Sequence, residues 1–228
     1  MIVILTPYYK AREVTQRMCE AIDANTINPY HHILIDDNSD NLLDIPTTRN
    51  RSILAIRNDV PGKIHKNQLG QGVQLGVDFA LQHFSREEPR TQDIDYVFLI
   101  ESDVIVLEKG WDQKQIDLIS ELPSDWGTLD VQSVNEEGNI TYPTTHSTRL
   151  GFVDDGLEIM EYPDFQCTLF NPRILDGRVK FSDFPSHFDI LFGRKTTEVY
   201  GVKHYRTRKL KVLHVNGGGS SRDLLPKE

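Results

Sequence analysis

The sequence predicts an α/β fold in which a mostly parallel sheet is flanked by helices and extended by a smaller mixed portion. Up to about residue 122, short apolar runs alternate with amphipathic segments, which is typical of a parallel sheet with covering helices. After Trp126, strand-like segments follow one another without helices between them. The 228 residues contain no Pro/Gly/Ser-rich linker and no repeat, so one domain is favoured.

Each predicted strand is a short apolar or β-branched run that ends near a turn-forming residue. The predicted strands are 2–5, 31–35, 52–56, 96–100, 128–134, 139–142, 165–170 and 209–215. Each predicted helix carries apolar residues at helical spacing. The predicted helices are 11–24, 69–84, 111–122 and 186–200. In the second of these helices, Leu75, Phe79 and Leu81 are candidates for the buried side.

Composition narrows the class of protein. A formal net charge of −9 and a pI of about 5.4 argue against a binder of duplex nucleic acid. One basic run, residues 204–211, is expected to be a solvated face or a strand edge. The two cysteines, Cys19 and Cys167, lack metal-ligand spacing, so we expect buried free thiols in a reducing compartment.

The amino-terminal segment reads as a first strand. Residues 1–5 contain a short apolar run without a basic region before it, unlike a signal peptide. No apolar stretch in the sequence approaches the roughly 18 residues that a membrane-spanning helix needs. We therefore expect a cytoplasmic protein without a membrane span.

The most informative segment is Asp95-Tyr-Val-Phe-Leu-Ile-Glu-Ser-Asp103. Its apolar part predicts a buried strand that delivers Glu101 and Asp103 at its carboxyl end, the edge where ligands bind in open α/β sheets. Two carboxylates spaced in this way suit a hard divalent cation that is shared with a diphosphate. The alternative is a strand that ends in a solvated acidic turn.

Two further segments of the first half carry candidate ligand contacts. Asp36 and Asp37 end the second predicted strand, where a carboxylate can accept hydrogen bonds from a base or a ribose, or can serve as a turn or helix cap. The stretch 67–76 brings glycines to a helix start, which can favour a phosphate. Close packing of the helix on the sheet is the alternative explanation for Gly76.

His214 ends the last predicted strand and precedes a glycine run, Gly217–Gly219. Neutral imidazole is an acceptable third ligand for a manganese-like ion, although a histidine at a strand end is often only structural. Backbone N–H groups of the glycine run are expected to close over phosphates.

Taken together and in this order, these segments resemble the family 2 glycosyltransferases and their relatives with the GT-A fold. The resemblance rests on Leu5-Thr-Pro-Tyr-Tyr9, Ile33-Leu-Ile-Asp-Asp-Asn-Ser39, the Gly70–Gly76 stretch, Phe98-Leu-Ile-Glu-Ser-Asp-Val104 with Gly110-Trp111, and His214. It implies one GT-A-like domain over residues 1–228. Residues 1–110 would form its nucleotide-binding half and residues 111–228 its acceptor-side half.

The resemblance also implies roles for individual residues. Glu101-Ser102-Asp103 looks like the DXD motif, so Asp103, together with His214, would bind Mn²⁺ or Mg²⁺. The implied contacts to the nucleotide-diphosphate sugar are Thr6, Pro7, Tyr8, Asp37, Gly70, Gln74, Glu101 and Ser102. Two positions depart from the family pattern, because the first acid of the motif is a glutamate and Gln74 stands where the family usually has asparagine.

The catalytic base is less clearly marked. The family commonly carries an acidic cluster on a helix of the second half, and here Ser186-His-Phe-Asp189 keeps only the last acid. Asp189 is the first candidate, and Asp183 and His187 are the others. An inverting enzyme needs such a base near the acceptor hydroxyl, whereas a retaining enzyme does not, so both outcomes stay open. Trp126, Tyr142, Tyr162 and Phe165 are either acceptor-side aromatics or ordinary core or surface residues.

The function implied is transfer of a sugar, of hexosyl type, from a nucleotide-diphosphate sugar to a hydroxyl of a glycan or another acceptor. A nucleotidyltransferase acting on a sugar phosphate is one alternative, although such enzymes usually open with a glycine-rich basic loop that residues 6–11 do not provide. A non-catalytic, degenerate GT-A domain is another. The donor base, the acceptor and the oligomeric state are left open.

Overall fold

The computed structural model describes residues 1–8, 12–37, 48, 50–56, 69–84, 94–141, 148–184 and 187–215. These residues form one ten-stranded sheet with the order β3-β2-β1-β4-β9-β6-β10-β8-β7, and β5 pairs with β10. The strands are β1 (Ile2–Tyr8), β2 (Tyr30–Asp37), β3 (Arg51–Ile56), β4 (Tyr96–Ile100), β5 (Val104–Val106), β6 (Trp126–Val134), β7 (Arg149–Asp154), β8 (Leu157–Met160), β9 (Cys167–Phe170) and β10 (Lys203–His214).

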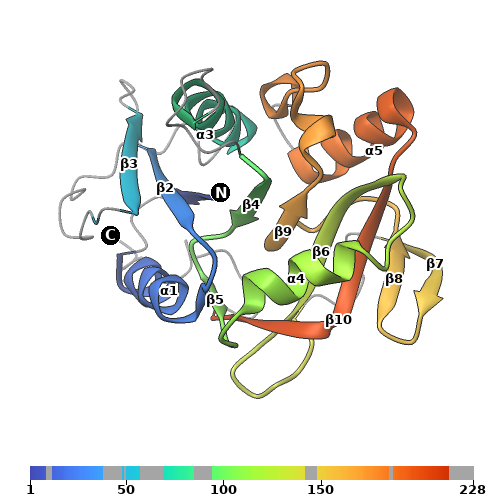
Figure 1. The fold of residues 1–228 in the computed structure, drawn as a ribbon, viewed down its shortest axis with the longest axis horizontal. Helices are drawn as coiled ribbons and strands as arrows, with labels where there is room; N and C mark the ends of the chain where they lie inside the picture. Colours follow the sequence, from blue (N-terminus) through green and yellow to red (C-terminus); the bar gives the residue numbers. More distant parts are fainter. Residues whose placement is uncertain are drawn as a thin grey trace, which may run out of the picture.

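The predicted fold class is confirmed. Strands β3, β2, β1 and β4 are parallel neighbours, as the alternation in the first half predicts. Beyond β4 the sheet is mixed: β9 is antiparallel to both β4 and β6, whereas β6 and β10 are parallel. Because β9 from the second half of the chain pairs directly with β4, one sheet runs through both halves (Figure 1).

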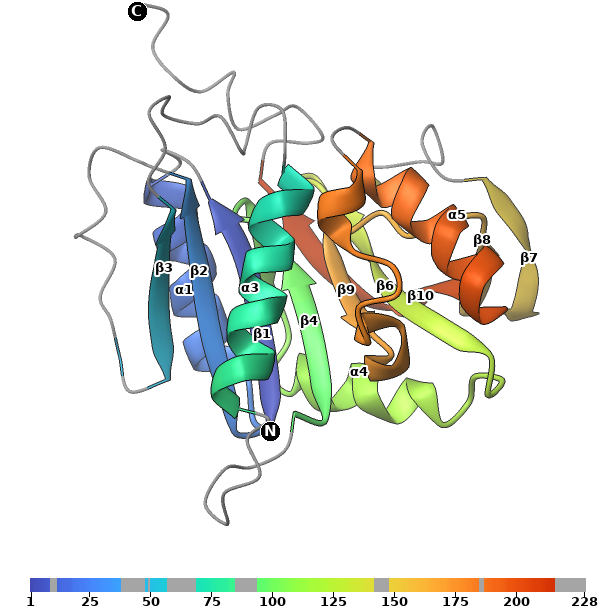
Figure 2. The same cartoon turned by 90° about the horizontal axis from the view of Figure 1, so that it is seen from above.

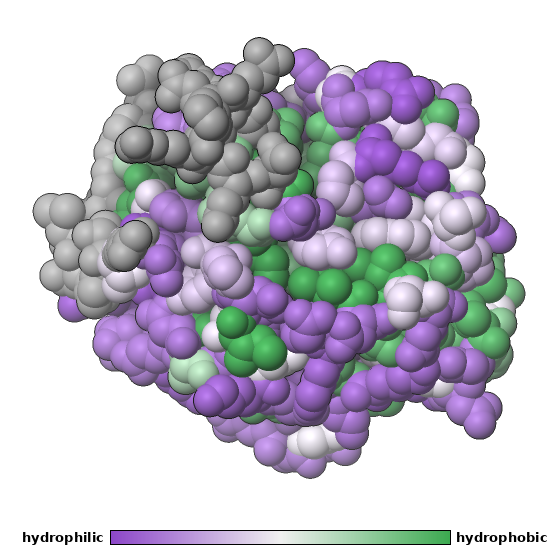
Figure 3. Space-filling model, in the orientation of Figure 1, coloured by the Kyte–Doolittle hydropathy of each residue, from purple (hydrophilic) through white to green (hydrophobic). Residues whose placement is uncertain are grey.

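Helices cover both faces of the sheet (Figure 2). The helices are α1 (Arg12–Asn25), α3 (Leu69–Phe84), α4 (Trp111–Ile119) and α5 (Phe188–Tyr200), with short 3₁₀ helices η2 (Pro172–Leu175) and η3 (Phe181–Asp183). The hydrophobic cluster under α1 and α4 includes Met18, Ile22 and Trp111. The cluster on the other face, under α3 and α5, includes Val77 and Phe192. On the face drawn in Figure 3, hydrophilic residues predominate around a band of hydrophobic ones.

The predicted buried side of α3 is wrong in part. Leu75 and Leu81 are 44% and 38% exposed, and Phe79 is only partly buried. The buried side instead combines glycines and Ala80 with Val73, Gln74 and Val77. A Cβ at Gly76 would lie 2.5 Å from the Ile35 side chain, so glycine is needed for this close approach. Close packing of the helix on the sheet therefore explains Gly76, which was the alternative to a role in phosphate binding.

The expectation for the basic run 204–211 is also wrong in part. The run forms most of β10, which lies inside the sheet between β6 and β8 and is not an edge. Its first four residues, 204–207, are buried. Only Arg208, Lys209 and Lys211 of the run are exposed, as a solvated face would be. The basic residues made this central strand look like a surface strand. Arg206 can be buried because Glu158 and Asp164 pair with it.

Three smaller expectations have clear outcomes. Cys19 and Cys167 are both buried free thiols, as predicted. Trp126 and Phe165 are buried and belong to the two hydrophobic clusters, while Tyr142 lies outside the described residues. Within the described part of the chain, no helix is both long and apolar enough to cross a membrane.

Candidate metal and substrate site

The acidic segment after β4 forms a tight turn. Glu101 directly follows the strand, and its N–H donates to the carbonyl of Gln166 at 3.0 Å, which ties the turn to β9. The N–H of Val104 donates to the carbonyl of Glu101 at 3.1 Å and closes the turn into β5. Glu101 and Asp103 therefore leave the same turn, with the buried Ser102 between them.

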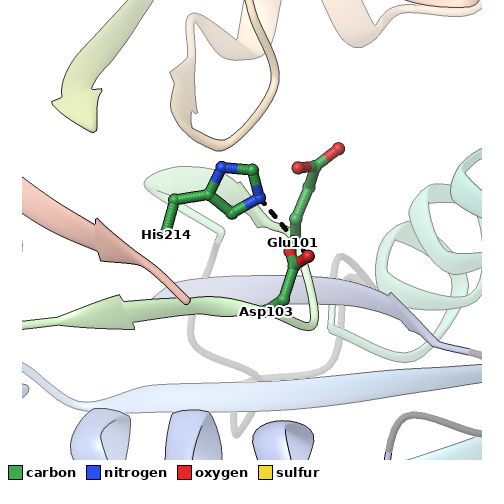
Figure 4. A group of neighbouring side chains, drawn as sticks. All are labelled: Glu101, Asp103 and His214. Carbon is green, nitrogen blue, oxygen red and sulfur yellow. Dashed lines mark ion pairs between the residues drawn. The ribbon is translucent and has the colours of Figure 1, made fainter. Parts of the chain in front are cut away.

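His214 reaches this turn through strand pairing. β5 is antiparallel to β10, with His214 opposite Val104, so the imidazole lies next to Asp103. Its Nε2 is 3.3 Å from the Asp103 Oδ2, and a dashed line marks this pair in Figure 4. The N–H of Val215 also donates to the carbonyl of Asp103 at 3.0 Å. Residues more than a hundred positions apart in the sequence are thus brought together.

Glu101, Asp103 and His214 offer one ligand atom each within 4.8 Å of one another. Burial raises the pKa of Glu101 well above its usual value, and the negative charges of Asp103, Asp189 and Asp164 add to this effect. A cation between these groups would relieve that repulsion. Two carboxylates and one imidazole are also ligands that a manganese-like ion accepts, so the donor set fits the expected metal.

The residues expected near the nucleotide have largely buried side chains. The Thr6 side chain is fully buried and its Oγ1 lies 3.0 Å from the Nε2 of His32. Arg51 Nε donates to His32 Nδ1 at 3.2 Å, so Nε2 carries the hydrogen and Thr6 accepts it. Pro7 is buried, and Tyr8 packs in the cluster under α1. Their contact with a nucleotide stays a prediction.

Asp37 ends β2, where the parallel register places Asp36 beside Tyr8. The carboxyl ends of β1 and β2 therefore meet at one edge of the sheet, as a base-binding role for Asp37 requires. The Asp37 side chain lies outside the described part of the structure. The Gly217–Gly219 run lies outside it as well.

Gly70 and Gln74 connect α3 to η3. A Cβ at Gly70 would lie 2.3 Å from the carbonyl oxygen of Phe181, so only glycine permits this close approach. Gln74 accepts a hydrogen bond from the N–H of Phe181 at 2.9 Å and donates to Asp78 at 2.8 Å. Both residues hold the segment that precedes α5, and their expected contact with the donor stays a prediction.

The two acidic candidates for the base differ in their surroundings. Asp183 is exposed, and its carboxylate accepts the N–H of Lys180 at 3.1 Å as part of η3. Asp189 is partly buried in the first turn of α5, and its charge raises the pKa of both Glu101 and Tyr162. His187, before this turn, is exposed and has a left-handed φ of 49°. Of the two acidic candidates, only Asp189 therefore has a charge that acts on Glu101 of the candidate metal site.

No protein-family model matches the sequence, and no curated protein sequence matches it. Solved structures do resemble it. Two of them are S. aureus TarS 1-349 in complex with UDP-GlcNAc (TM-score 0.61, 12% identity, 98% of this chain and 60% of that chain) and GalNAc-T7 with UDP, GalNAc and Mn²⁺ (0.62, 10%, 94% and 43%). S. aureus TarS itself matches with a TM-score of 0.60 and 9% identity over 94% of this chain and 36% of that chain.

The chain has the GT-A fold. It spans between 36% and 60% of the length of these GT-A structures. Membership of family 2 and the division at residue 110 stay predictions.

No sequence motif marks a charged network that lies at strands β6, β8 and β10 and at the segment between β8 and β9. The network consists of Glu158, Arg206, Asp164 and Asp130. The Asp164 N–H donates to Asp130 Oδ2 at 2.9 Å, and Thr168 donates to the other oxygen. Burial raises the pKa of Asp130 to about 7, with a further contribution from the charge of Asp164. The one visible signal was the occurrence of charged residues within strand-like runs.

Asp130→Asn is expected to remove a pH dependence of stability. Because the folded-state pKa of Asp130 exceeds its usual value of 3.8, the folded protein binds more protons than the unfolded chain between about pH 4 and pH 7. The wild-type free energy of unfolding therefore falls with rising pH in this window, by at most about 1.4 kcal/mol per pH unit from this group. The asparagine variant has no such titrating group. Its free energy of unfolding minus that of wild type should therefore increase as the pH rises to about 7.

Urea unfolding at several pH values measures this difference. Asp155→Asn, in the exposed turn between β7 and β8, is the control and should follow wild type. A difference between Asp130→Asn and wild type that stays constant from pH 5 to pH 8 would contradict the prediction.

Proposed function

We propose that this protein is a metal-dependent glycosyltransferase that moves a sugar from a nucleotide-diphosphate sugar to an acceptor hydroxyl. The observation that carries the proposal is the convergence of Glu101, Asp103 and His214 at the carboxyl edge of a GT-A sheet. Fold alone does not define an activity. A cation-sized group of ligands at the edge where α/β sheets bind substrates adds the chemistry.

Asp103 and His214, with Glu101 beside them, are the residues that would hold Mn²⁺ or Mg²⁺. When bound, such an ion neutralises the charge that develops on the departing diphosphate. The turn that carries Asp103 is held by backbone hydrogen bonds from Glu101 to Gln166 and from Val215 to Asp103. These bonds keep the ligands in place before the donor arrives, which is the preorganisation that such a site needs.

Asp189 is the proposed general base for an inverting reaction. A base must lie within hydrogen-bond reach of the acceptor hydroxyl and take up its proton as the sugar is transferred. The charge of Asp189 acts on Glu101, a residue of the metal-ligand cluster. Asp183 is a weaker candidate because its carboxylate already caps η3.

The donor is proposed to be a uridine-diphosphate sugar, with Asp37 as the residue that reads the base. Support comes from the similar structures, which hold UDP or UDP-GlcNAc in TarS and UDP with GalNAc and Mn²⁺ in GalNAc-T7. We further propose a hexosyltransferase of the family 2 type that acts in the cytoplasm. Its acceptor would be a glycan or another hydroxyl compound.

Calorimetry with UDP in the presence and absence of Mn²⁺ tests the proposal. We expect binding with Mn²⁺ and a clear loss when EDTA is added, followed by slow release of UDP from at least one of UDP-Glc, UDP-Gal, UDP-GlcNAc and UDP-GalNAc. Metal-dependent binding without any release would favour a non-catalytic domain. Pyrophosphate release from UTP and a sugar phosphate would favour a nucleotidyltransferase.

A further inference from the structure

The segment 161–166 links β8 to β9 and places Asp164 against buried charges of the sheet. β8 ends at Met160, which is opposite His204 of β10, and β9 begins at Cys167, which is opposite Ile100 of β4. The segment must therefore pass over the strands between them, β10 and β6. Its backbone is held there by Asp130, which accepts the Asp164 N–H, and by the Gln166 carbonyl that accepts the Glu101 N–H.

Arg206 is the cation beneath this segment. Its side chain is 3% exposed, and its Nε and Nη2 both donate to Glu158 Oε2, at 3.0 and 2.8 Å. The remaining Nη1 donates to Asp164 Oδ2 at 3.2 Å. Although burial raises the pKa of Glu158, its hydrogen bonds and ion pairs with Arg206, Arg149 and Arg208 together outweigh this effect, and the net pKa is lowered. The guanidinium is thus held on one side by a buried anion and presents its other side to Asp164.

Asp164 connects this pair to the proposed site. Its side chain is 14% exposed, and it lies two residues before Gln166, the residue tied to Glu101. Phe165, between them, has a left-handed φ of 59°, which is uncommon for a bulky residue. The Asp164 carboxylate is therefore two residues away from the backbone contact that joins this segment to the turn carrying Glu101 and Asp103.

Packing alone does not explain this arrangement. Removing paired charges from water is expensive, and well-packed apolar side chains often hold a segment at least as well. A guanidinium fork differs from an apolar contact because it sets both the position and the charge state of the carboxylate that it binds. Arg149 and Arg208 also pair with Glu158, but their side chains are 41% and 44% exposed.

We propose that Arg206 is a positioning residue which, through Asp164 and the segment that ends at Gln166, sets the place of Glu101 in the candidate site. The inference rests on the proposed glycosyltransferase function and deepens it. Glu158 anchors Arg206 and Arg206 orients Asp164. Asp164 lies two residues before Gln166, whose carbonyl accepts the Glu101 N–H.

The test is hydrolysis of UDP-sugars with Mn²⁺, in which water takes the place of the acceptor. Arg206→Lys keeps the charge but cannot hold Glu158 and Asp164 with one fork. We expect its kcat to fall about 10- to 100-fold, as for a misplaced reacting group, with KM for the donor changed by less than about threefold. Asp164→Asn should have a similar effect, and the double variant should be no worse than the single ones, because both act through one contact.

Arg208→Lys is the matched control, since it alters a bond to the same Glu158 without touching Asp164, and it should keep wild-type kcat. Melting temperatures identify a variant that fails to fold; if Arg206→Lys does, Asp164→Asn, which retains the N–H bond to Asp130, decides. Wild-type kcat in Asp164→Asn, or multiplicative losses in the double variant, would overturn the inference while leaving the proposed function intact. A wild-type protein that neither binds UDP nor hydrolyses any donor overturns both.

Discussion

Asp103→Asn is expected to abolish metal-dependent turnover of the donor while leaving the protein folded. Asp103 contributes a ligand atom to the cluster with Glu101 and His214, and an amide is a much poorer ligand for Mn²⁺ than a carboxylate. The amide has nearly the same shape as the carboxylate and can keep the 3.3 Å contact with His214 Nε2, so the local structure should persist. We expect donor hydrolysis to fall about 100- to 1,000-fold, the scale seen when one group that stabilises transition-state charge is removed.

Two measurements distinguish loss of the metal from loss of the fold. Calorimetry should show that UDP binding to Asp103→Asn no longer responds to Mn²⁺, while the melting temperature without metal stays near that of wild type. Glu108→Gln is the matched control, because Glu108 is a partly exposed acid between β5 and α4 whose carboxylate pairs with Lys114, away from the candidate site. Wild-type turnover by Asp103→Asn would remove this residue from the metal site.

Asp189→Asn is expected to lower kcat about 100- to 10,000-fold, the usual contribution of a general base. The asparagine cannot accept the proton of the acceptor hydroxyl. Binding of UDP and Mn²⁺ should be unchanged, since Asp189 belongs to α5 and not to the metal-ligand group. Hydrolysis assays with the four UDP-sugars, together with UDP calorimetry, measure the two effects separately.

Asp183→Asn is the control for this prediction. Its amide oxygen can still accept the N–H of Lys180, so η3 should be retained and kcat should stay close to that of wild type. A large fall in kcat for Asp183→Asn with little change for Asp189→Asn would assign the role of general base to Asp183 instead of Asp189. Wild-type rates in both variants, with a competent wild-type enzyme, would favour a retaining reaction that uses no such base.

Local periodicity was sufficient for most of the elements in the first half of the chain. The predicted helix at 69–84 and the predicted strand at 96–100 have the same bounds as α3 and β4. Both are flanked by turn-forming or polar residues, and each has one pattern throughout its length. In the second half, the hairpin β7–β8 was not predicted; β7 is exposed along nearly its whole length, and β8 has only four residues.

The errors share one cause, which is that packing partners decide which side of an element is buried. On α3, the small residues Gly76 and Ala80 face the sheet because they allow close approach, while the larger Leu75 stays exposed. In β10, Arg206 is buried because Glu158 and Asp164 lie beside it. A pattern of hydrophobicity along one element cannot reveal partners that other strands supply.

The sequence by itself determined the α/β class and the strands that end in Glu101, Asp103 and His214, because local propensity and hydrophobic period act over a few neighbouring residues. Only the tertiary structure decided that His214 meets Asp103, since this depends on the antiparallel pairing of β5 with β10. It also decided that Asp164 and Asp189 lie close enough to act on Glu101, because burial and the charges supplied by distant segments together set the pKa of a carboxylate.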